Sequence, residues 1–295
     1  VRFHLSAIYN DKLYIVMEGE DSNFILYEAD VNGSNRKEIL SLGKVDFSSK
    51  SLFLDNYLLM EYRIGYDLEN VDSGEMRKLE KPISGLAIIN IKKQEVDYIP
   101  EKVEYEGGIT KIHMYEDKVY YEYVFMDVEY DFMDHENIDF DYLADHSFHR
   151  IYSYDVKTGT ESIVYEGQDL YVKEFNENYA FLTKTKENEN IYALNLSNQK
   201  EELIIEENLY GFCCVDGDRI VYLGYPQNDA EAVEAEEDLY SHFYYYDMVS
   251  KESYYIGSSN RNKIVLIEMF LGDYAYIMYM LTDSEIMYAA GHGCI

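Results

Sequence analysis

Tryptophan is absent from this 295-residue chain, and cysteine and proline occur only three times each. An odd, low number of cysteines argues against a disulfide scaffold, and no cysteine–histidine spacing of a structural zinc site is present. No apolar run reaches the roughly 18 residues of a membrane helix. The longest apolar region, Ile264 to Leu281, is interrupted by Glu268 and Asp273. We therefore expect no transmembrane segment.

Basic residues are also scarce. Lys and Arg number 25 against 57 Asp and Glu, which gives a formal net charge of −32. Nucleic-acid binding needs clustered Lys and Arg, so this composition excludes that class, and it disfavours an anionic membrane surface. The charge favours cations and basic partners instead. The simpler alternative is that the charge only keeps the protein in solution.

What is abundant is tyrosine, with 33 residues, and a short phrase that returns six times. Each copy is a polar turn carrying Asp, Asn or Gly, followed by an apolar, aromatic-rich run. The copies are Asn10–Tyr14, Asp55–Leu58, Glu116–Tyr120, Asn176–Ala180, Asp216–Ile220 and Gly272–Tyr276. Repeated units built only of strand-like segments are typical of a β-propeller.

We therefore predict an all-β fold, a single β-propeller domain of four-stranded antiparallel blades over residues 1–295. The approximate blades are 3–42, 46–100, 109–166, 169–207, 209–258 and 263–290. The last unit has no convincing fourth strand, so six blades are favoured and seven remain the alternative if a unit lies outside these residues. A linear solenoid is the structural rival, but meander-like units of this size favour the closed ring.

Two outer hairpins carry a family resemblance. Residues Ile25–Leu40 and Ile151–Thr160 share a Tyr-containing strand, an Asp and a turn that contains Gly33 or Gly159. This pattern resembles TolB-type and low-density-lipoprotein-receptor-type (YWTD-like) propellers of bacterial surface and secreted proteins. The absence of tryptophan removes the WD and Tyr-Trp-Thr-Asp signatures themselves. The resemblance implies a location outside the cytoplasm and a non-catalytic role, and it carries no catalytic residue across.

Three connections between second and third strands are long: 64–85, 126–149 and 225–242. Such connections share one face of a propeller, and long loops carry function more often than short ones. We therefore predict a binding face on these loops. Its candidate residues are Asp127, Asp131, Asp134, Asp139, Asp141, Tyr142, Asp145, Glu236 and Asp238.

Three occupants of this acidic face stay open. Asp139, Asp141 and Asp145 form a candidate Ca²⁺ site, since hard cations take carboxylate oxygens. A transition-metal site using His146 and His149 has weaker support. A basic peptide or protein partner would be attracted by the opposite charge. The last interpretation is an acidic rim without a specific ligand.

We expect a non-catalytic binding module with no catalytic residues. The alternative is a propeller hydrolase, similar to a glycosidase or lactonase, with carboxylates and Ca²⁺ near the central channel. Glycosidase chemistry needs two carboxyl groups at a defined separation, and inner-strand acids such as Asp46, Glu174 and Glu268 are candidates. No GxSxG, P-loop or HExxH motif is present.

Overall fold

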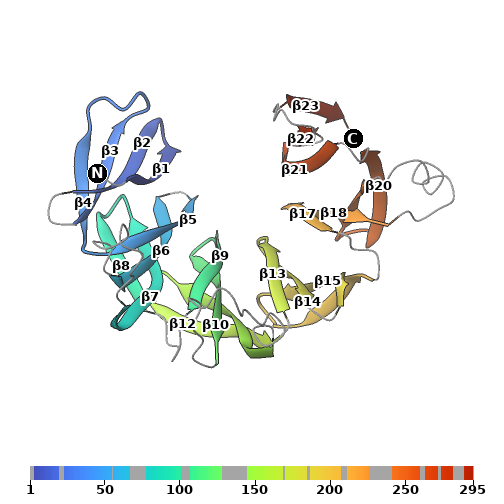
Figure 1. Cartoon of the computed structure of the whole chain (residues 1–295), viewed down its shortest axis with the longest axis horizontal. Helices are drawn as coiled ribbons and strands as arrows, with labels where there is room; N and C mark the ends of the chain where they lie inside the picture. Colours follow the sequence, from blue (N-terminus) through green and yellow to red (C-terminus); the bar gives the residue numbers. More distant parts are fainter. Residues whose placement is uncertain are drawn as a thin grey trace. The chain divides into compact units, whose positions relative to one another are not determined.

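The computed structural model describes residues 3–19, 23–54, 56–66, 78–100, 107–127, 145–168, 170–184, 187–206, 211–225, 241–259, 263–271, 274–281 and 289–294. The chain divides into two compact units, Val1–Gln168 and Asp169–Ile295. Each unit is built of antiparallel sheets whose strands follow one another along the chain (Figure 1).

The first unit contains three four-stranded sheets. The first sheet consists of β1 (Phe3–Tyr9), β2 (Lys12–Glu18), β3 (Phe24–Asp30) and β4 (Lys37–Gly43). The second consists of β5 (Asp46–Leu54), β6 (Tyr57–Tyr66), β7 (Lys78–Asn90) and β8 (Glu95–Pro100). The third consists of β9 (Gly107–Tyr115), β10 (Lys118–Met126), β11 (Ser147–Asp155) and β12 (Thr160–Gln168).

The second unit continues the pattern. One sheet consists of β13 (Leu170–Phe175), β14 (Tyr179–Lys184), β15 (Glu187–Asn195) and β16 (Glu201–Ile205). The next consists of β17 (Gly211–Asp216), β18 (Arg219–Gly224), β19 (Ser241–Asp247) and β20 (Glu252–Ser259). Within the described residues, the final sheet has the three strands β21 (Lys263–Leu271), β22 (Tyr274–Leu281) and β23 (Ala289–Cys294).

Two strands differ from the sequence expectation. The β6–β7 hairpin extends to the pair Tyr66–Lys78, so much of the expected 64–85 loop is strand. The third strand of the last sheet lies at Ala289–Cys294 rather than at residues 285–289, and Tyr274 pairs with Cys294. Pairing with Tyr274–Tyr279 of β22 decides this register, because local composition gives only a weak preference for strand.

The turn after the third strand of several sheets repeats one arrangement. The Oδ1 atom of Asp155 accepts hydrogen bonds from Lys157 N and Thr158 N, at 2.9 Å each. Asn195 and Asp247 accept equivalent bonds in their own turns. A residue with positive φ then closes each of these turns, as it does after Asp30 and Asn90: Asn35, Gln94, Gly159, Gln199 and Lys251. Asp and Asn thus replace backbone partners, which explains how the chain turns with so few glycines.

Tyrosine fills the space between neighbouring sheets. Tyr14 and Tyr62 lie in one cluster with Val16 and Phe47, between the first two sheets. Burial raises the pKa of Tyr98 to about 12, and its hydroxyl donates to Leu42 O. A ring with a polar tip buries a large area and still satisfies its hydroxyl group. These pairings explain the high tyrosine content.

The first strand of every sheet carries an irregularity. In each first pair, the register shifts by at least one residue. In the third sheet, Tyr123 opposes Ile109 and Glu122 opposes Lys111, so Thr110 is the extra residue. A β-bulge re-aims side chains and is common beside functional sites. This bulge positions the site described below.

A glycine at a positive-φ turn position should stabilise the fold. Gln94 has φ 59°, which strains a residue with a Cβ. We expect Gln94→Gly to raise the free energy of unfolding by about 0.5 kcal/mol, the strain relief less the entropy cost of glycine. Thermal denaturation measures the effect. Lys93→Gly, at a neighbouring position without positive φ, is the matched control and should destabilise, and equal effects would contradict the strain argument.

The acid stability of the third sheet should depend on Asp155. The backbone hydrogen bond from Thr158, followed by that from Lys157, holds the pKa of Asp155 below its ordinary value. A lowered folded-state pKa contributes stability above the ordinary value, and this contribution is lost as the pH falls through the folded-state pKa. Asp155→Asn, which copies Asn195, should therefore flatten the dependence of Tm on pH below about 4. Asp155→Ala should instead lower Tm at every pH, and an unchanged acid slope in Asp155→Asn would contradict the assignment.

Candidate functional site

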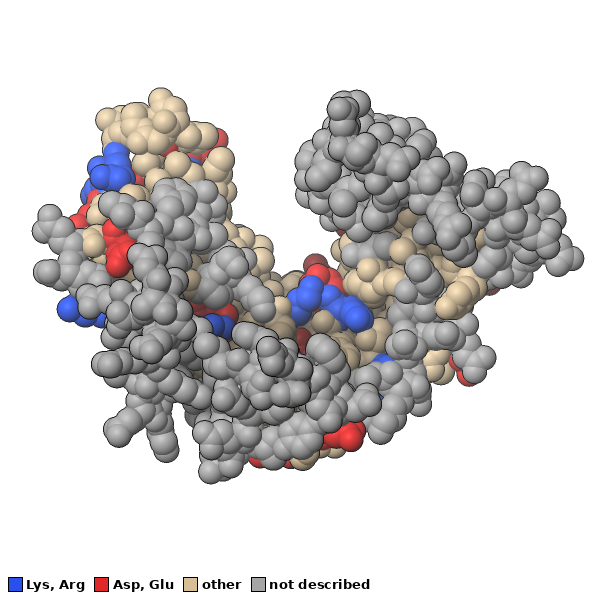
Figure 2. Space-filling view, in the orientation of Figure 1, with Lys and Arg blue, Asp and Glu red and all other residues tan. Residues whose placement is uncertain are grey.

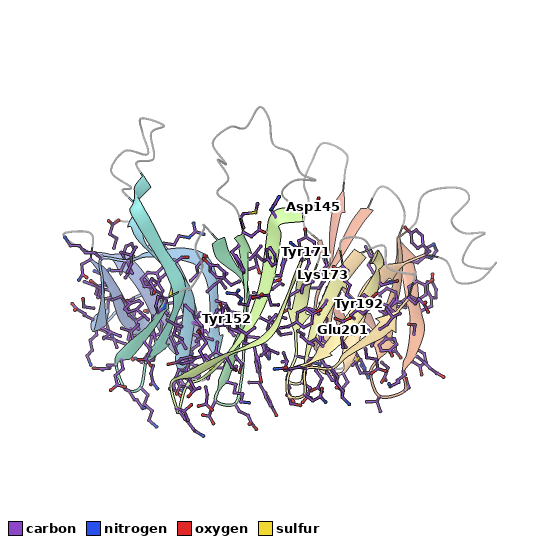
Figure 3. The ribbon with its side chains drawn as sticks, turned by 90° about the horizontal axis from the view of Figure 1, so that it is seen from below. Asp145, Tyr152, Tyr171, Lys173, Tyr192 and Glu201 are labelled. Carbon is purple, nitrogen blue, oxygen red and sulfur yellow. The ribbon has the colours of Figure 1, made fainter. Side chains whose placement is uncertain are left out.

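The predicted acidic face is described only at its two ends. Asp127 and Asp145 are exposed, and Asp145 lies near one end of the third sheet, with Tyr152 farther along β11 (Figure 3). The other candidates lie outside the described residues: Asp131, Asp134, Asp139, Asp141, Tyr142, Glu236 and Asp238. The acidic binding face and its Ca²⁺ site at Asp139, Asp141 and Asp145 stay predictions.

The base of the 127–146 insertion is closed by two contacts. Asp127 N donates to His146 O at 3.1 Å, and Asp127 Oδ1 lies 2.8 Å from His146 Nδ1. Gln168 Nε2 in addition donates to Asp145 O at 3.1 Å. These contacts hold the last residues of the insertion against the sheet from which it leaves.

Shortening this insertion should therefore leave the sheet intact. We expect replacement of residues 128–144 by a short Gly-Ser linker to keep cooperative unfolding and a nearly unchanged Tm, because the closing contacts remain. Circular dichroism during heating measures both. The same replacement combined with Asp127→Ala is the control and should lower Tm. Loss of the cooperative transition in the first variant would show that the insertion is structural.

A buried polar chain crosses the third sheet. Glu122 of β10 and His149 of β11 are each 2% exposed, and Glu122 Oε1 lies 2.9 Å from His149 Nδ1. The hydroxyl group of the bulge residue Thr110 donates to Glu122 Oε2. Thr110 is only partly buried. The chain therefore runs from a partly exposed hydroxyl through a carboxylate to an imidazole.

Burial of a carboxylate is costly unless it is hydrogen-bonded. Glu122 meets this demand with two donors, and an ionised Glu122 places the proton of the neutral imidazole on Nδ1 of His149. A carboxylate and an imidazole in contact at a buried site have the geometry that general acid–base catalysis requires.

A second carboxylate, that of Glu61, contacts the backbone of β9, the strand that carries Thr110. Glu61 and Arg63 are two residues apart on β6, so they share a face of that strand. Glu61 Oε1 accepts hydrogen bonds from Arg63 Nη2 at 3.2 Å and from Ile109 N at 3.3 Å. The Glu61 side chain is 2% exposed, whereas that of Arg63 is 41% exposed. A buried carboxylate is thus joined to a guanidinium that reaches solvent.

Two glycines allow this close approach. A Cβ at Gly107 would lie 2.5 Å from Val124 O, so only glycine fits there. A Cβ at Gly108 would meet Glu61 Oε1 at 3.1 Å and Arg63 Nη2 at 3.6 Å. The side-chain position of residue 108 thus opens onto the Glu61–Arg63 pair. We call Glu61, Arg63, Gly108 and Ile109 N the Gly108 subsite.

The surroundings of Gly107 supply aromatic rings and hydroxyl groups. Phe125 opposes Gly107 across the β9–β10 pair and stacks on Phe148 with 5.7 Å between ring centroids. Arg150 lies over Phe125 at 4.7 Å. In the same inter-sheet region, the Ser84 and Tyr123 hydroxyls are 2.8 Å apart.

The two histidines considered for a transition metal, His146 and His149, contact different carboxylates. His146 is bonded to Asp127, and His149 is bonded to Glu122. No group of three or more His, Cys, Asp and Glu in the described part of the chain is arranged to hold a metal ion.

In the same part of the chain, no helix is long and apolar enough to span a membrane. On the face shown in Figure 2, Lys and Arg atoms lie in small groups beside Asp and Glu.

No family model and no curated protein matches the chain. Solved structures do match it. The β-propeller domain of the Trilobed protease from Pyrococcus furiosus has a TM-score of 0.56 at 12% identity, covering 98% of this chain and 81% of that one. The fold is a β-propeller. The TolB-type and YWTD-like assignments, the number of blades, the single-domain assignment and the location outside the cytoplasm stay predictions.

Two further likenesses concern enzymes. An oligogalacturonate lyase in complex with manganese has a TM-score of 0.56 at 13% identity, with 92% of this chain and 68% of that one covered. The Pyrococcus horikoshii acylaminoacyl peptidase has a TM-score of 0.58 at 11% identity and covers 99% of this chain. This chain spans 44% of the peptidase's length.

These findings correct the expected function. The prediction of a non-catalytic binding module is wrong, because the similar solved structures belong to a lyase and to peptidases. The prediction that the chain has no catalytic residues is not tested. The prediction followed from a resemblance in two outer hairpins, and outer hairpins report on blade structure rather than on chemistry. The enzyme alternative is taken up as a proposal in the next subsection.

The sequence reasoning missed the residues of the inner strands. It named Asp46, Glu174 and Glu268 as inner-strand acids, and only the side chain of Glu174 is described. Glu174 Oε1 accepts a hydrogen bond from the next residue, Phe175 N, at 3.1 Å. The available signal was a single acid within an apolar or aromatic strand, as in Met60-Glu61-Tyr62 and Tyr121-Glu122-Tyr123.

Proposed function

We propose that this chain is a propeller enzyme of the hydrolase type, with its proton-transfer group at Thr110, Glu122 and His149. The observation that carries the proposal is the buried Glu122–His149 pair, which is joined to the partly exposed Thr110. Buried carboxylate–imidazole pairs are common where a protein must move a proton, and structural ion pairs are the competing explanation.

Each residue has a distinct role in this proposal. Glu122 accepts the proton of a hydroxyl group at the position of Thr110, either the threonine itself or a water beside it. His149 stabilises the ionised carboxylate through Nδ1 and shares the proton during turnover. The activated hydroxyl group then attacks an acyl or glycosyl centre, the bond from that centre to the leaving oxygen breaks, and the leaving oxygen takes the proton. Where Thr110 is the attacking group, a water then hydrolyses the covalent intermediate.

The second carboxylate, Glu61, accepts a hydrogen bond from Ile109 N, which is next to Thr110 on β9. Gly108 and Thr110 are two residues apart on β9, so this strand carries one residue of each group. The proposal places the substrate along β9, with its reacting bond at Thr110. We add Ca²⁺ or Mn²⁺ to the assay below, because the Ca²⁺ prediction is open and the similar lyase structure holds manganese.

Hydrolysis of chromogenic substrates tests the proposal. The panel consists of p-nitrophenyl glycosides, a p-nitrophenyl ester and a lactone, each with a chelator, Ca²⁺ or Mn²⁺. We expect turnover of at least one class, and Glu122→Gln should lower its kcat by about 100-fold or more, the usual contribution of general base catalysis. Glu177→Gln, at an exposed turn position in the other unit, is the matched control and should leave kcat unchanged.

Two outcomes would overturn the proposal. One is a folded wild-type chain that hydrolyses no member of the panel under any metal condition. The other is a measurable activity that Glu122→Gln and His149→Gln do not reduce. A loss of kcat that is accompanied by a large fall in Tm would point to a structural pair. The melting curve of each variant is therefore recorded beside its kinetics.

A further inference from the structure

The Gly108 subsite combines an acceptor and a donor in one small area. Glu61 Oε1 accepts from Arg63 and from Ile109 N. The Glu61 side chain is 2% exposed, so these two bonds hold a buried carboxylate beside a partly exposed arginine.

Packing alone does not account for glycine at position 108. Gly108 does not have a positive φ, and a Cβ there would make one tight contact without a clash below 3.0 Å. Glycine inside a strand costs backbone entropy and adds no side-chain packing. Gly107 next to it is different, because a Cβ there clashes with backbone. Glycine at position 108 leaves open the space beside the ion pair that a Cβ, 3.1 Å from Glu61 Oε1, would crowd.

The chemistry of the pair limits the ligand. The Glu61 carboxylate offers an acceptor, and the partly exposed Arg63 guanidinium offers donors. The two charges cancel, so neither a cation nor an anion gains a full opposite charge. An anion would also meet the carboxylate and the −32 net charge of the chain. Neighbouring hydroxyl groups satisfy both partners, one by donating to Glu61 and one by accepting from Arg63.

The adjoining residues fit the same kind of ligand. The stacked Phe125 and Phe148 rings are partly exposed and lie beside Gly107. The Ser84 hydroxyl is partly buried in the same region. An apolar ring face beside a few fixed polar groups is typical of small-molecule sites. A sugar ring offers both an apolar face and adjacent hydroxyl groups.

We propose that the Gly108 subsite binds a neutral, hydroxyl-rich substrate, namely an uncharged saccharide, through Glu61 and Arg63. This inference rests on the proposed function and names its substrate class. It assigns the bond to be broken to a glycoside whose sugar lies over Gly108, with the glycosidic oxygen toward Thr110.

Binding measured without turnover tests the inference. The probes are maltotriose, cellotriose and mannotriose as neutral saccharides, trigalacturonate as an anionic saccharide and trilysine as a cation. Saturation-transfer NMR detects binding, and calorimetric titration gives Kd. We expect at least one neutral trisaccharide to bind, while trigalacturonate and trilysine do not compete with it.

Variants locate the binding. Gly108→Ala places a methyl group over the pair and should weaken binding by about tenfold or more, as expected when hydrogen bonds to a charged group are lost. Arg63→Gln is a second variant at a partly exposed position, which keeps the test valid if Gly108→Ala fails to fold. Gly257→Ala is the matched control, because a Cβ there meets nothing within 4 Å.

The outcomes separate the two proposals. Glu122→Gln should keep saccharide binding while losing hydrolysis. Binding without any hydrolysis in the wild type would overturn the proposed function and support the subsite. Hydrolysis of an ester or lactone with no saccharide binding would overturn the subsite alone. Preferred binding of trigalacturonate or trilysine, or an unchanged Kd in both Gly108→Ala and Arg63→Gln, would also overturn it.

Discussion

Face-to-face packing of successive sheets is the constraint on which the other features depend. Within the first unit, Leu59 and Leu86 of the second sheet pack with Tyr121 and Tyr152 of the third. Each inner sheet buries both faces, so polar groups placed there must find partners within the protein. Tyrosine satisfies this demand with its hydroxyl group, as in the Tyr121 OH bond to Glu161 at 2.6 Å. For the same reason, each buried acid must have hydrogen-bond donors, and these donors have to be identified.

Glu61 and Glu122 occupy matching positions in this packing. Each is the fifth residue of its strand, counted from Tyr57 of β6 and Lys118 of β10. The equivalent residue of β14 is the buried Thr183, and that of β2 is the buried Val16. An apolar residue is therefore compatible with this position in the fold. Acids at two neighbouring sheets are a property of this chain rather than a requirement of the architecture.

Much of the fold was predictable from local sequence. The repeated polar turns predicted the first hairpin of each sheet. In later turns, Asp155, Asn195 and Asp247 accept hydrogen bonds from backbone N–H groups a few residues away. Strand bounds were less predictable where tertiary pairing decides them, as at Lys78 and Ala289. Hairpin signals are local in the chain, whereas the length of a strand depends on the partner that it meets.

The site was less predictable for a related reason. Thr110, Glu122 and His149 are separated by 12 to 39 positions along the chain, and only sheet pairing brings them together. The bulge that turns Thr110 toward Glu122 leaves no mark in composition. The acidic 126–149 connection was conspicuous because its charges are dense in the sequence, but dense charge often serves solubility alone. The Gly107–Gly108 pair was the stronger local signal, since two glycines in a strand indicate close backbone approach.

Exposed and buried carboxylates differ in the free energy of desolvation that folding must offset. An exposed carboxylate on a loop needs no partner and can be replaced with little effect on the fold. A buried carboxylate must be stabilised by donors, and Glu122 and Glu61 together engage a hydroxyl, an imidazole, a guanidinium and a backbone N–H. Replacing such groups with apolar residues of similar volume is often neutral or stabilising. Stability therefore does not by itself explain why both acids are present.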